Sequence, residues 1–308
     1  MVMKADVKKR LSLLVTGRVA HDEPMAGHTS IGIGGTADVY CEPATVDELR
    51  KVLFLLAEND VPCMPVGNGT NILVRDDGYR GAVVCLSRLQ GLVFHDGNGD
   101  DVIVSCEAGV SLSRLVDESA ERSIGGLAFV AGIPGSVGGA VSMNAGAYGR
   151  EMKDVISLIR TIDRTGRVGD RMPTSLTFRY RCLELDAGEI VVGADFRLTR
   201  GDRQGIEEDI AEIRRLRRGK HPLQYRNAGS VFKNPAWAPA GRIIDELGLK
   251  GRRVGDAMVS AEHGNFIVNC GSATAADVIE LMTIITETVE RERGIHLEPE
   301  VRIIGGNG

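Results

Sequence analysis

The stretch GIPGSVGGAVSMNAGAYG, residues 132–149, decides the fold that we expect for this chain. Glycine recurs through it, with Pro134 near its start and Asn144 near its end. Such a density of glycine weakens an ordinary strand or helix, because glycine loses the most backbone entropy on folding. Close approach of the main chain to a large flat ligand explains the glycines better. Glycines that only permit a tight, bulged crossover are the alternative.

A second glycine loop, GNGTN at residues 67–71, lies between the apolar runs VPCMPV and ILVR. Both runs are typical of short buried strands. Glycines in the loop leave backbone N–H groups open to a phosphate, and an ordinary glycine hairpin is the other interpretation. The loop is not GxGxxG and no helix follows it, so a Rossmann-type dinucleotide site is disfavoured.

Periodicity outward from these loops predicts an α+β architecture. Thr45 and Glu48 form a capping box before an apolar helical face that ends at Asn59 and Asp60. Further strands are expected at GAVVCL, GLVFH, DVIVSCEAG and EIVVGADFRL, and helices at residues 112–121 and 205–218. The last third predicts a short helix at GRIIDELGL, a strand at NFIVNC, a long helix over residues 274–293 ended by Gly294, and a final strand in LEPEVRIIG.

Composition and charge exclude several classes of protein. A chain of 308 residues is expected to form two or three packed units, and 43% hydrophobic with 26% charged residues is ordinary for a globular protein. The formal net charge of −5 disfavours a nucleic-acid partner. The apolar run LSLLV is too short for a signal peptide, so we expect an amphipathic first helix. The cysteines fit reduced core thiols of a cytosolic protein and no zinc site: Cys41, Cys63, Cys85, Cys106, Cys182 and Cys270.

Five separated motifs resemble the MurB family of UDP-N-acetylenolpyruvoylglucosamine reductases and occur in that family's order. They are HTSIGIGGTAD (28–38), PVGNGTNILV (65–74), GLAFVAGIPGSVGGAVSMNAGAYG (126–149), NAGSVFKNP (227–235) and LEPEVRIIG (297–305). The resemblance implies a vanillyl-alcohol-oxidase-like (PCMH-type) FAD-binding domain in two lobes and a C-terminal α+β substrate-binding domain. The implied bounds are 1–80 and 81–203 for the lobes, 204–297 for the substrate domain and 298–308 for a last strand and tail. The chain resembles the shorter subtype of the family, without an inserted tyrosine-bearing loop.

The resemblance also implies an activity, that of a UDP-N-acetylmuramate dehydrogenase in peptidoglycan precursor synthesis. Such an enzyme uses FAD and NADPH to reduce UDP-N-acetylglucosamine enolpyruvate, with hydride passing from flavin N5 to C3. We expect noncovalent FAD, because Thr70 and Asn71 stand where covalent relatives of the wider fold often carry histidine. No metal, nucleic acid or membrane insertion is expected, and the protein is expected to be a cytoplasmic monomer or weak dimer. The preference for NADPH over NADH stays open.

Three residues match the family's catalytic positions. Ser230 is the implied general acid that protonates C2, although a lone serine in such a turn is more often structural. Arg181 is the implied partner of the enolpyruvyl carboxylate, which an arginine fork suits, with Arg179 as its competitor. Glu300 is implied to polarise the enolpyruvyl group or stabilise the intermediate through a hydrogen bond, although a carboxylate near a terminus is usually solvated.

Cofactor and substrate contacts are also implied by position. Lys220 and Arg217 supply positive charge for a diphosphate, whereas a basic helix end favoured by the macrodipole is the plainer interpretation. Substrate contacts are expected from Tyr180, Arg217, Lys220, Gly229, Asn234 and His263. FAD contacts are expected from Gly67, Asn68, Gly69, Thr70, Asn71, Gly132, Ile133, Pro134, Gly135, Val137, Gly138, Gly139, Ala140, Asn144, Gly146 and Ala147.

Two other functions stay open. One is another FAD-dependent oxidase or dehydrogenase of the same fold, acting on an alcohol or sugar lactone. The other is a nucleotide-sugar binding protein that has lost catalysis. The presence of Ser230, Arg181 and Glu300 in one chain argues against both. NADPH oxidation that depends on the UDP-enolpyruvyl sugar distinguishes them from the reductase.

Overall fold

The computed structural model describes residues 3–219, 221–222 and 224–306, which divide into two compact units. Both units are discontinuous in sequence, and the four-part division expected from the resemblance stays a prediction. Unit 1 comprises Met1–His21, Val39–Asn68 and Gly81–Leu216, and unit 2 comprises Asp22–Asp38, Gly69–Arg80 and Arg217–Gly308.

Two helices and part of a sheet form one core of unit 1. Helix α1 (Ala5–Leu14), the expected amphipathic helix, packs against α2 (Val46–Glu58). Half of the capping box predicted for α2 is present, since Thr45 Oγ1 accepts a hydrogen bond from Glu48 N at 3.1 Å. The Glu48 carboxylate reaches past the cap and accepts from the N–H of Ala44 at 2.8 Å. Strand order in the adjoining sheet is β1-β2-β5-β3, with β1 (Val19–Pro24), β2 (Thr36–Cys41), β3 (Cys63–Val66) and β5 (Tyr79–Cys85).

The larger sheet of unit 1 has the order β12-β11-β15-β7-β6, with the short β8 paired to β15. Helices α3 (Leu112–Glu121) and α5 (Arg203–Arg218) share a second core with these strands. Alternate residues of β7 face that core, which is the two-residue period of a half-buried strand. The strands are β6 (Leu92–Asp96), β7 (Asp101–Glu107), β8 (Ile124–Gly125), β11 (Ile156–Ile162), β12 (Val168–Arg171) and β15 (Ile190–Arg200).

Unit 2 combines a four-stranded sheet, two helices and a parallel strand pair around its own core. Helix α7 begins after Thr274, which forms a reciprocal capping box with Asp277, and it ends at Gly294 with φ 66°. Both of these ends are as the sequence predicts. The elements are β4 (Ile72–Val74) paired with β20 (Arg302–Ile304), the sheet β16 (Arg226–Ser230), β19 (Phe266–Asn269), β18 (Ala257–Val259) and β17 (Arg253–Val254), and helices α6 (Ala240–Glu246) and α7 (Ala275–Arg293).

The cysteines are free thiols, as expected for a protein without disulfides. Burial raises the pKa of the Cys63 thiol to about 12, and that of Cys106 also to about 12, so both thiols are protonated at neutral pH. Within the described ranges, no three His, Cys, Asp or Glu side chains gather closely enough to hold a metal ion. No described helix has the length and apolar character that a membrane span requires.

Candidate functional site

The glycine-rich segment of residues 132–149 runs through unit 1 and includes the short helix α4 (Val137–Ser142). Its main chain is bonded to the turn that follows β7, because Gly138 N donates to Ala108 O at 2.9 Å. A Cβ on Gly138 would stand 2.7 Å from the Cβ of Ala108. Packing within the protein therefore accounts for this glycine, as the crossover alternative expects.

Gly139 leaves room for a ligand, whereas Gly67 is required by close packing. A Cβ on Gly139 would meet only Ser136 Oγ, at an ordinary 3.6 Å, and a Cβ on Gly67 would stand 2.3 Å from the same oxygen. The two predicted cofactor segments therefore meet at Ser136. The backbone N–H groups of Gly67 and Asn68 have no acceptor among the residues that the structure describes. Such backbone donors bind phosphate oxygens, so these residues fit the diphosphate of FAD.

The loop Gly67–Asn71 does not close a hairpin. Strand β3 pairs in parallel with β5, and β4 pairs in parallel with β20. The alternative of an ordinary glycine hairpin is therefore wrong. Gly69 has φ +64°, and a Cβ there would stand 2.0 Å from the carbonyl oxygen of His28. Only glycine fits this turn, because it combines a left-handed backbone with close main-chain contact.

Ser230 ends strand β16 of unit 2, directly after a bulge. The pairing of β16 with β19 shifts register between Asn227 and Ser230, and Gly229 adopts φ +79°. The Asn227 side-chain oxygen accepts a hydrogen bond from Gly229 N at 3.0 Å, which holds the bulge. The Ser230 side chain is half-buried and makes no hydrogen bond to another described residue. Its hydroxyl is therefore available to a ligand.

Glu300 lies beside Ser230 through the main chain of unit 2. Glu300 N donates to the carbonyl of Val231, the residue after Ser230, at 2.8 Å. The side-chain amide of Asn71 donates to the carbonyl of Glu300 at 3.1 Å. Arg302 N in turn donates to the carbonyl of Asn71 at 3.0 Å. Unit 2 thus brings together one predicted cofactor residue and two predicted catalytic residues.

Asn265 supports this cluster and was not predicted from the sequence. It is 3% exposed, and its side-chain amide both donates to Phe232 O at 2.8 Å and accepts from Phe232 N at 2.9 Å. Its own carbonyl accepts from Val231 N at 2.9 Å. The sequence gives one weak signal for it, an asparagine at the start of the expected apolar strand NFIVNC.

Arg181 lies in unit 1, in the two-residue turn of a hairpin formed by β13 (Thr177–Arg179) and β14 (Cys182–Glu184). Its φ is +58°, which is rare for a large side chain and costs about 1 to 3 kcal/mol. The Arg181 guanidinium stacks over the Tyr180 ring at 4.8 Å from the ring centroid. A strained, half-buried arginine at a hairpin tip is consistent with a functional position.

The side chain of Arg179, the alternative catalytic arginine, is bound in an ion pair on the protein surface. Its guanidinium forms an ion pair with Glu184, the second residue beyond its partner on β14, and it is 67% exposed. The hydrogen bond and charge of Glu184 raise the pKa of Arg179 further above its usual range. This surface pairing favours Arg181 as the catalytic arginine, although the assignment of both residues stays a prediction.

The other predicted substrate residues lie in several settings. The side-chain oxygen of Asn234 caps α6 by accepting from Ala240 N at 2.9 Å. His263 Nδ1 accepts from Asn265 N at 3.1 Å, so the proton of a neutral ring lies on Nε2. Arg217 is half-buried at the end of α5, and Lys220 lies outside the described residues. All these substrate contacts stay predictions.

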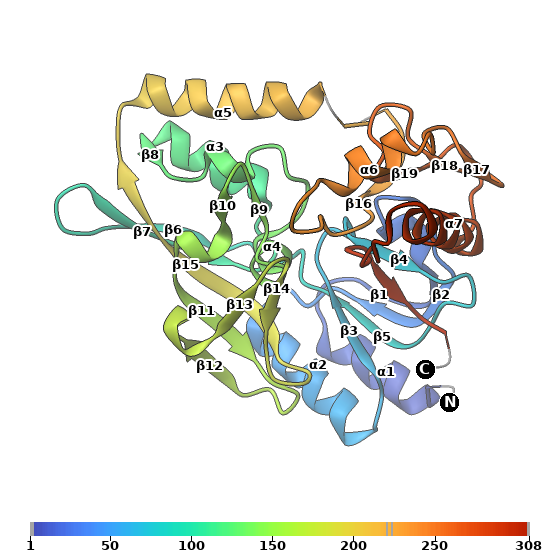
Figure 1. Ribbon diagram of the computed structural model, residues 1–308. Coiled ribbons are helices and arrows are strands. Elements are labelled where there is room, and N and C mark those ends of the chain that lie inside the picture. The colour runs from blue at the N-terminus through green and yellow to red at the C-terminus, as the bar shows by residue number, and fades with distance from the viewer. Residues whose placement is uncertain (1–2, 220, 223, 307–308) are drawn as a thin grey trace. The chain divides into compact units, whose positions relative to one another are not determined.

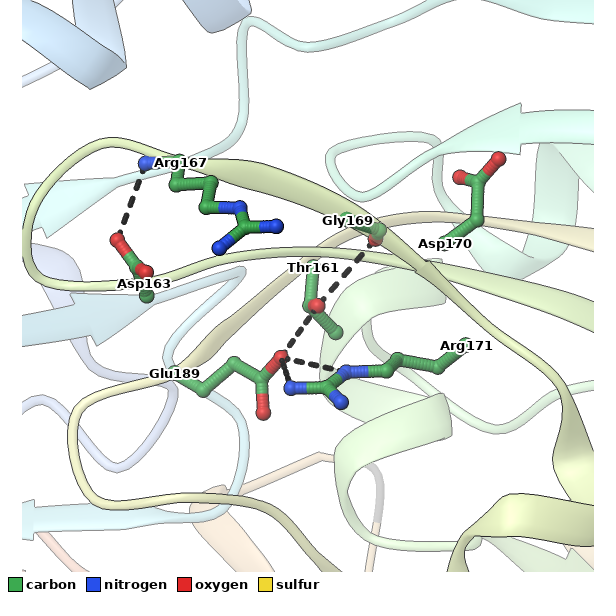
Figure 2. Close-up of a pocket in the computed structure, with 7 residues that line it drawn as sticks. All are labelled: Thr161, Asp163, Arg167, Gly169, Asp170, Arg171 and Glu189. Atoms are coloured by element: carbon green, nitrogen blue, oxygen red, sulfur yellow. Dashed lines mark hydrogen bonds and ion pairs between the residues drawn. The ribbon is translucent and has the colours of Figure 1, made fainter.

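A pocket of ≈ 290 Å³ lies elsewhere in unit 1, beside β11 and β12, and contains no predicted site residue. Figure 2 shows the Glu189 carboxylate between Thr161, whose hydroxyl donates to it at 2.5 Å, and Arg171, whose Nε donates at 3.0 Å. Burial raises the pKa of Glu189, but these hydrogen bonds and the charge of Arg171 outweigh it and lower the pKa. The lining carries acids and arginines together, and we interpret it as a structural polar network: Thr161, Asp163, Arg167, Gly169, Asp170, Arg171 and Glu189.

Comparison with known proteins gives matches along nearly the whole chain. A model of the UDP-N-acetylenolpyruvoylglucosamine reductase C-terminal domain matches residues 221–304, and an FAD binding domain matches residues 37–170. A UDP-N-acetylenolpyruvoylglucosamine reductase from Syntrophus aciditrophicus is 47% identical over 302 residues, covering 98% of this chain and 97% of the relative. One from Geobacter metallireducens is 45% identical over 303 residues, covering 98% and 99%.

A solved structure gives the same result. The crystal structure of UDP-N-acetylenolpyruvylglucosamine reductase (MurB) from Thermus caldophilus matches with a TM-score of 0.80 and 37% identity, covering 94% of this chain and 100% of that one. These matches confirm the predicted α+β fold, an FAD-binding domain with a C-terminal reductase domain. The chain belongs to the UDP-N-acetylenolpyruvoylglucosamine reductase (MurB) family.

Proposed function

We propose that this protein is a UDP-N-acetylmuramate dehydrogenase, which uses NADPH to reduce UDP-N-acetylglucosamine enolpyruvate. Its family and its FAD binding domain support this function. The observation that carries it is the cluster of unit 2, where Asn71 and the chain after Ser230 both bond to the backbone of Glu300. The last residue of the predicted phosphate loop is thereby joined, within unit 2, to the backbone beside two residues suited to proton chemistry.

Each residue has a distinct role in this proposal. FAD, when bound, carries the two electrons between NADPH and the enolpyruvyl double bond. The Ser230 hydroxyl gives a proton to C2 while the hydride ends on C3, so the double bond becomes a single bond and NADPH becomes NADP⁺. The Arg181 guanidinium binds the enolpyruvyl carboxylate through a two-pronged hydrogen bond. Glu300 polarises the enolpyruvyl group or stabilises the intermediate through a hydrogen bond.

The proposed substrate also bears on the cellular compartment and the partners of the protein. Reduction of a nucleotide sugar in peptidoglycan precursor synthesis is a cytoplasmic reaction, and we expect the protein there as a monomer or weak dimer. The substrate diphosphate needs cations in a chain of net charge −5, which supports a role for Arg217 and Lys220. The net charge also speaks against nucleic acid as a partner.

Steady-state NADPH oxidation by the purified holoprotein tests the function. We expect oxidation that depends on UDP-N-acetylglucosamine enolpyruvate, with one UDP-N-acetylmuramate formed for each NADPH consumed. Turnover of an alcohol or sugar lactone in place of this substrate would show another oxidoreductase of the same fold. Binding of the UDP sugar without NADPH oxidation would show a binding protein.

A further inference from the structure

Asn144 joins the glycine-rich segment to the hairpin that carries Arg181. Its side chain is completely buried within unit 1. The amide nitrogen donates to the carbonyl of Arg179 at 3.2 Å and to the carboxylate of Glu151 at 3.0 Å. The amide oxygen accepts from the N–H of Lys153 at 3.1 Å. One amide therefore bonds, through its donor and its acceptor groups, to three residues on two segments of chain.

The hydrogen bond to Arg179 reaches the Arg181 turn directly. Arg179 is the last residue of β13, and only Tyr180 separates it from Arg181. A two-stranded hairpin has little stability of its own, so its tip depends on what holds the strands. Helix α4, which leads into Asn144, also packs against β14 of this hairpin, as can be followed in Figure 1. The carbonyl of Arg179 is thus a fixed point next to the turn.

Strained backbone gathers around this network. Asn144 has φ 43°, Tyr148 has φ 53° and Arg181 has φ 58°. Tyr148 is in the turn between β9 (Gly146–Ala147) and β10 (Arg150–Glu151), and β10 ends at the Glu151 that binds Asn144. Asparagine tolerates the left-handed region, but tyrosine and arginine rarely adopt it. Such residues persist where the surroundings hold them, and they gather at functional sites.

We propose that Asn144 is a positioning residue for Arg181. Through the Arg179 carbonyl, its amide holds the hairpin tip so that the guanidinium reaches the substrate carboxylate. The proposal rests on the role given to Arg181 under the proposed function. This positioning role is separate from the FAD contact that is predicted for Asn144. Misplacement of a catalytic group by about 1 Å can lower a rate by about 10²-fold, so the loss of this bond has a measurable effect.

A double-mutant cycle on the holoenzyme tests the positioning role. The rate of flavin reoxidation by UDP-N-acetylglucosamine enolpyruvate is measured for Asn144→Gly, Arg181→Ala and the double variant. Glycine keeps the left-handed backbone and removes the side chain that makes the three hydrogen bonds. Asn144→Asp, which keeps the acceptor for Lys153 N, serves if the glycine variant does not fold. Glu184→Ala is the matched control, because it removes the surface ion pair of this hairpin and leaves the carbonyl of Arg179 and its bond to Asn144 in place.

We expect Asn144→Gly to slow reoxidation by about tenfold to 10²-fold and Arg181→Ala by at least about 10²-fold. The double variant should be no slower than Arg181→Ala, because no guanidinium is left to position. Glu184→Ala should stay within about twofold of the wild type, since it removes only a surface ion pair. Multiplication of the two effects in the double variant overturns the positioning role. A normal rate for Arg181→Ala instead overturns the carboxylate site of the proposed function.

Discussion

The side-chain amide of Asn71 donates a hydrogen bond to the backbone carbonyl of Glu300, with 3.1 Å between nitrogen and oxygen. The carbonyl of Asn71 accepts from Arg302 N at 3.0 Å, so this one residue holds the C-terminal strand on both sides of Val301. The pairing of β4 with β20 continues the same contact. The last residue of the predicted phosphate loop and the predicted catalytic glutamate are therefore parts of one structure within unit 2.

Asn71→Ala is expected to loosen the C-terminal strand. The lost hydrogen bond is worth about 1 kcal/mol, which corresponds to about fivefold faster amide exchange in β20. Hydrogen exchange of Arg302–Ile304 measures this effect. Asn68→Ala in the same loop is the control, since the Asn68 side chain is exposed. Equal exchange in both variants would mean that the Asn71 amide does not hold the strand.

Asp76→Ala is expected to destabilise the start of α7. The Asp76 carboxylate accepts from Ala275 N at 2.8 Å and from Ala276 N at 2.9 Å, and it does so from the loop after β4. Loss of a capping carboxylate costs about 0.5 to 2 kcal/mol. Urea unfolding measures the change in free energy. The exposed neighbour Asp77, changed to alanine, should alter it by no more than about 0.5 kcal/mol. Equal losses in the two variants would exclude a capping role.

Glu189→Gln is expected to lose stability in a pH-dependent way. The Glu189 side chain is 5% exposed, and its pKa is lowered by Thr161 and Arg171 despite burial. A carboxyl with a lowered folded pKa contributes stability above its unfolded pKa of about 4.3, and this stability is lost as the pH falls through the folded pKa. The difference in free energy of unfolding between wild type and variant should therefore shrink below about pH 4.

Urea unfolding at stepwise lower pH measures this difference. Asp170→Asn is the matched control, because Asp170 lines the same pocket but is exposed. A deficit of the Glu189→Gln variant that stays constant down to the acid limit of folding would show that the ionised form of Glu189 is not what stabilises the sheet.

FAD is expected to leave the protein intact on acid denaturation. The loop Gly67–Asn71 supplies backbone donors and no histidine or cysteine for covalent attachment. Absorbance of the supernatant and of the precipitated chain measures where the flavin goes. Flavin that stays with the precipitate would contradict noncovalent binding.

The helices could be predicted closely because their ends carry local signals. Thr274 and Gly294 bound α7, and Thr45 bounds α2, since caps act within three or four residues of chain. The hairpin β13–β14 was missed for the opposite reason. Its turn is Tyr180–Arg181, without the glycine or asparagine that marks such turns, and tertiary contacts set the left-handed φ of Arg181.

The members of the site could be proposed from motifs, but their contacts could not. Asn71 and Glu300 are 229 residues apart, and nothing local in either segment indicates their hydrogen bond. The hydrogen bond from the Asn144 side chain to the Arg179 carbonyl could not be predicted either, because the sequence does not indicate the hairpin that carries Arg179. The density of glycine in residues 132–149 also has two causes that the sequence does not separate. Packing requires Gly138, whereas there is open space beside the Cα of Gly139.

In the proposed function, Ser230 gives the proton that completes reduction of the enolpyruvyl group. Stopped-flow spectroscopy of Ser230→Ala measures the two half-reactions separately, as bleaching of the flavin by NADPH and its return with UDP-N-acetylglucosamine enolpyruvate. Ser272→Ala, an exposed serine of the same unit, is the control. We expect bleaching within about tenfold of the wild type and return of colour slowed by about 10² to 10⁴-fold, some 3 to 5 kcal/mol of barrier. Equal slowing of both half-reactions would show that Ser230 shapes the pocket and is not the proton donor.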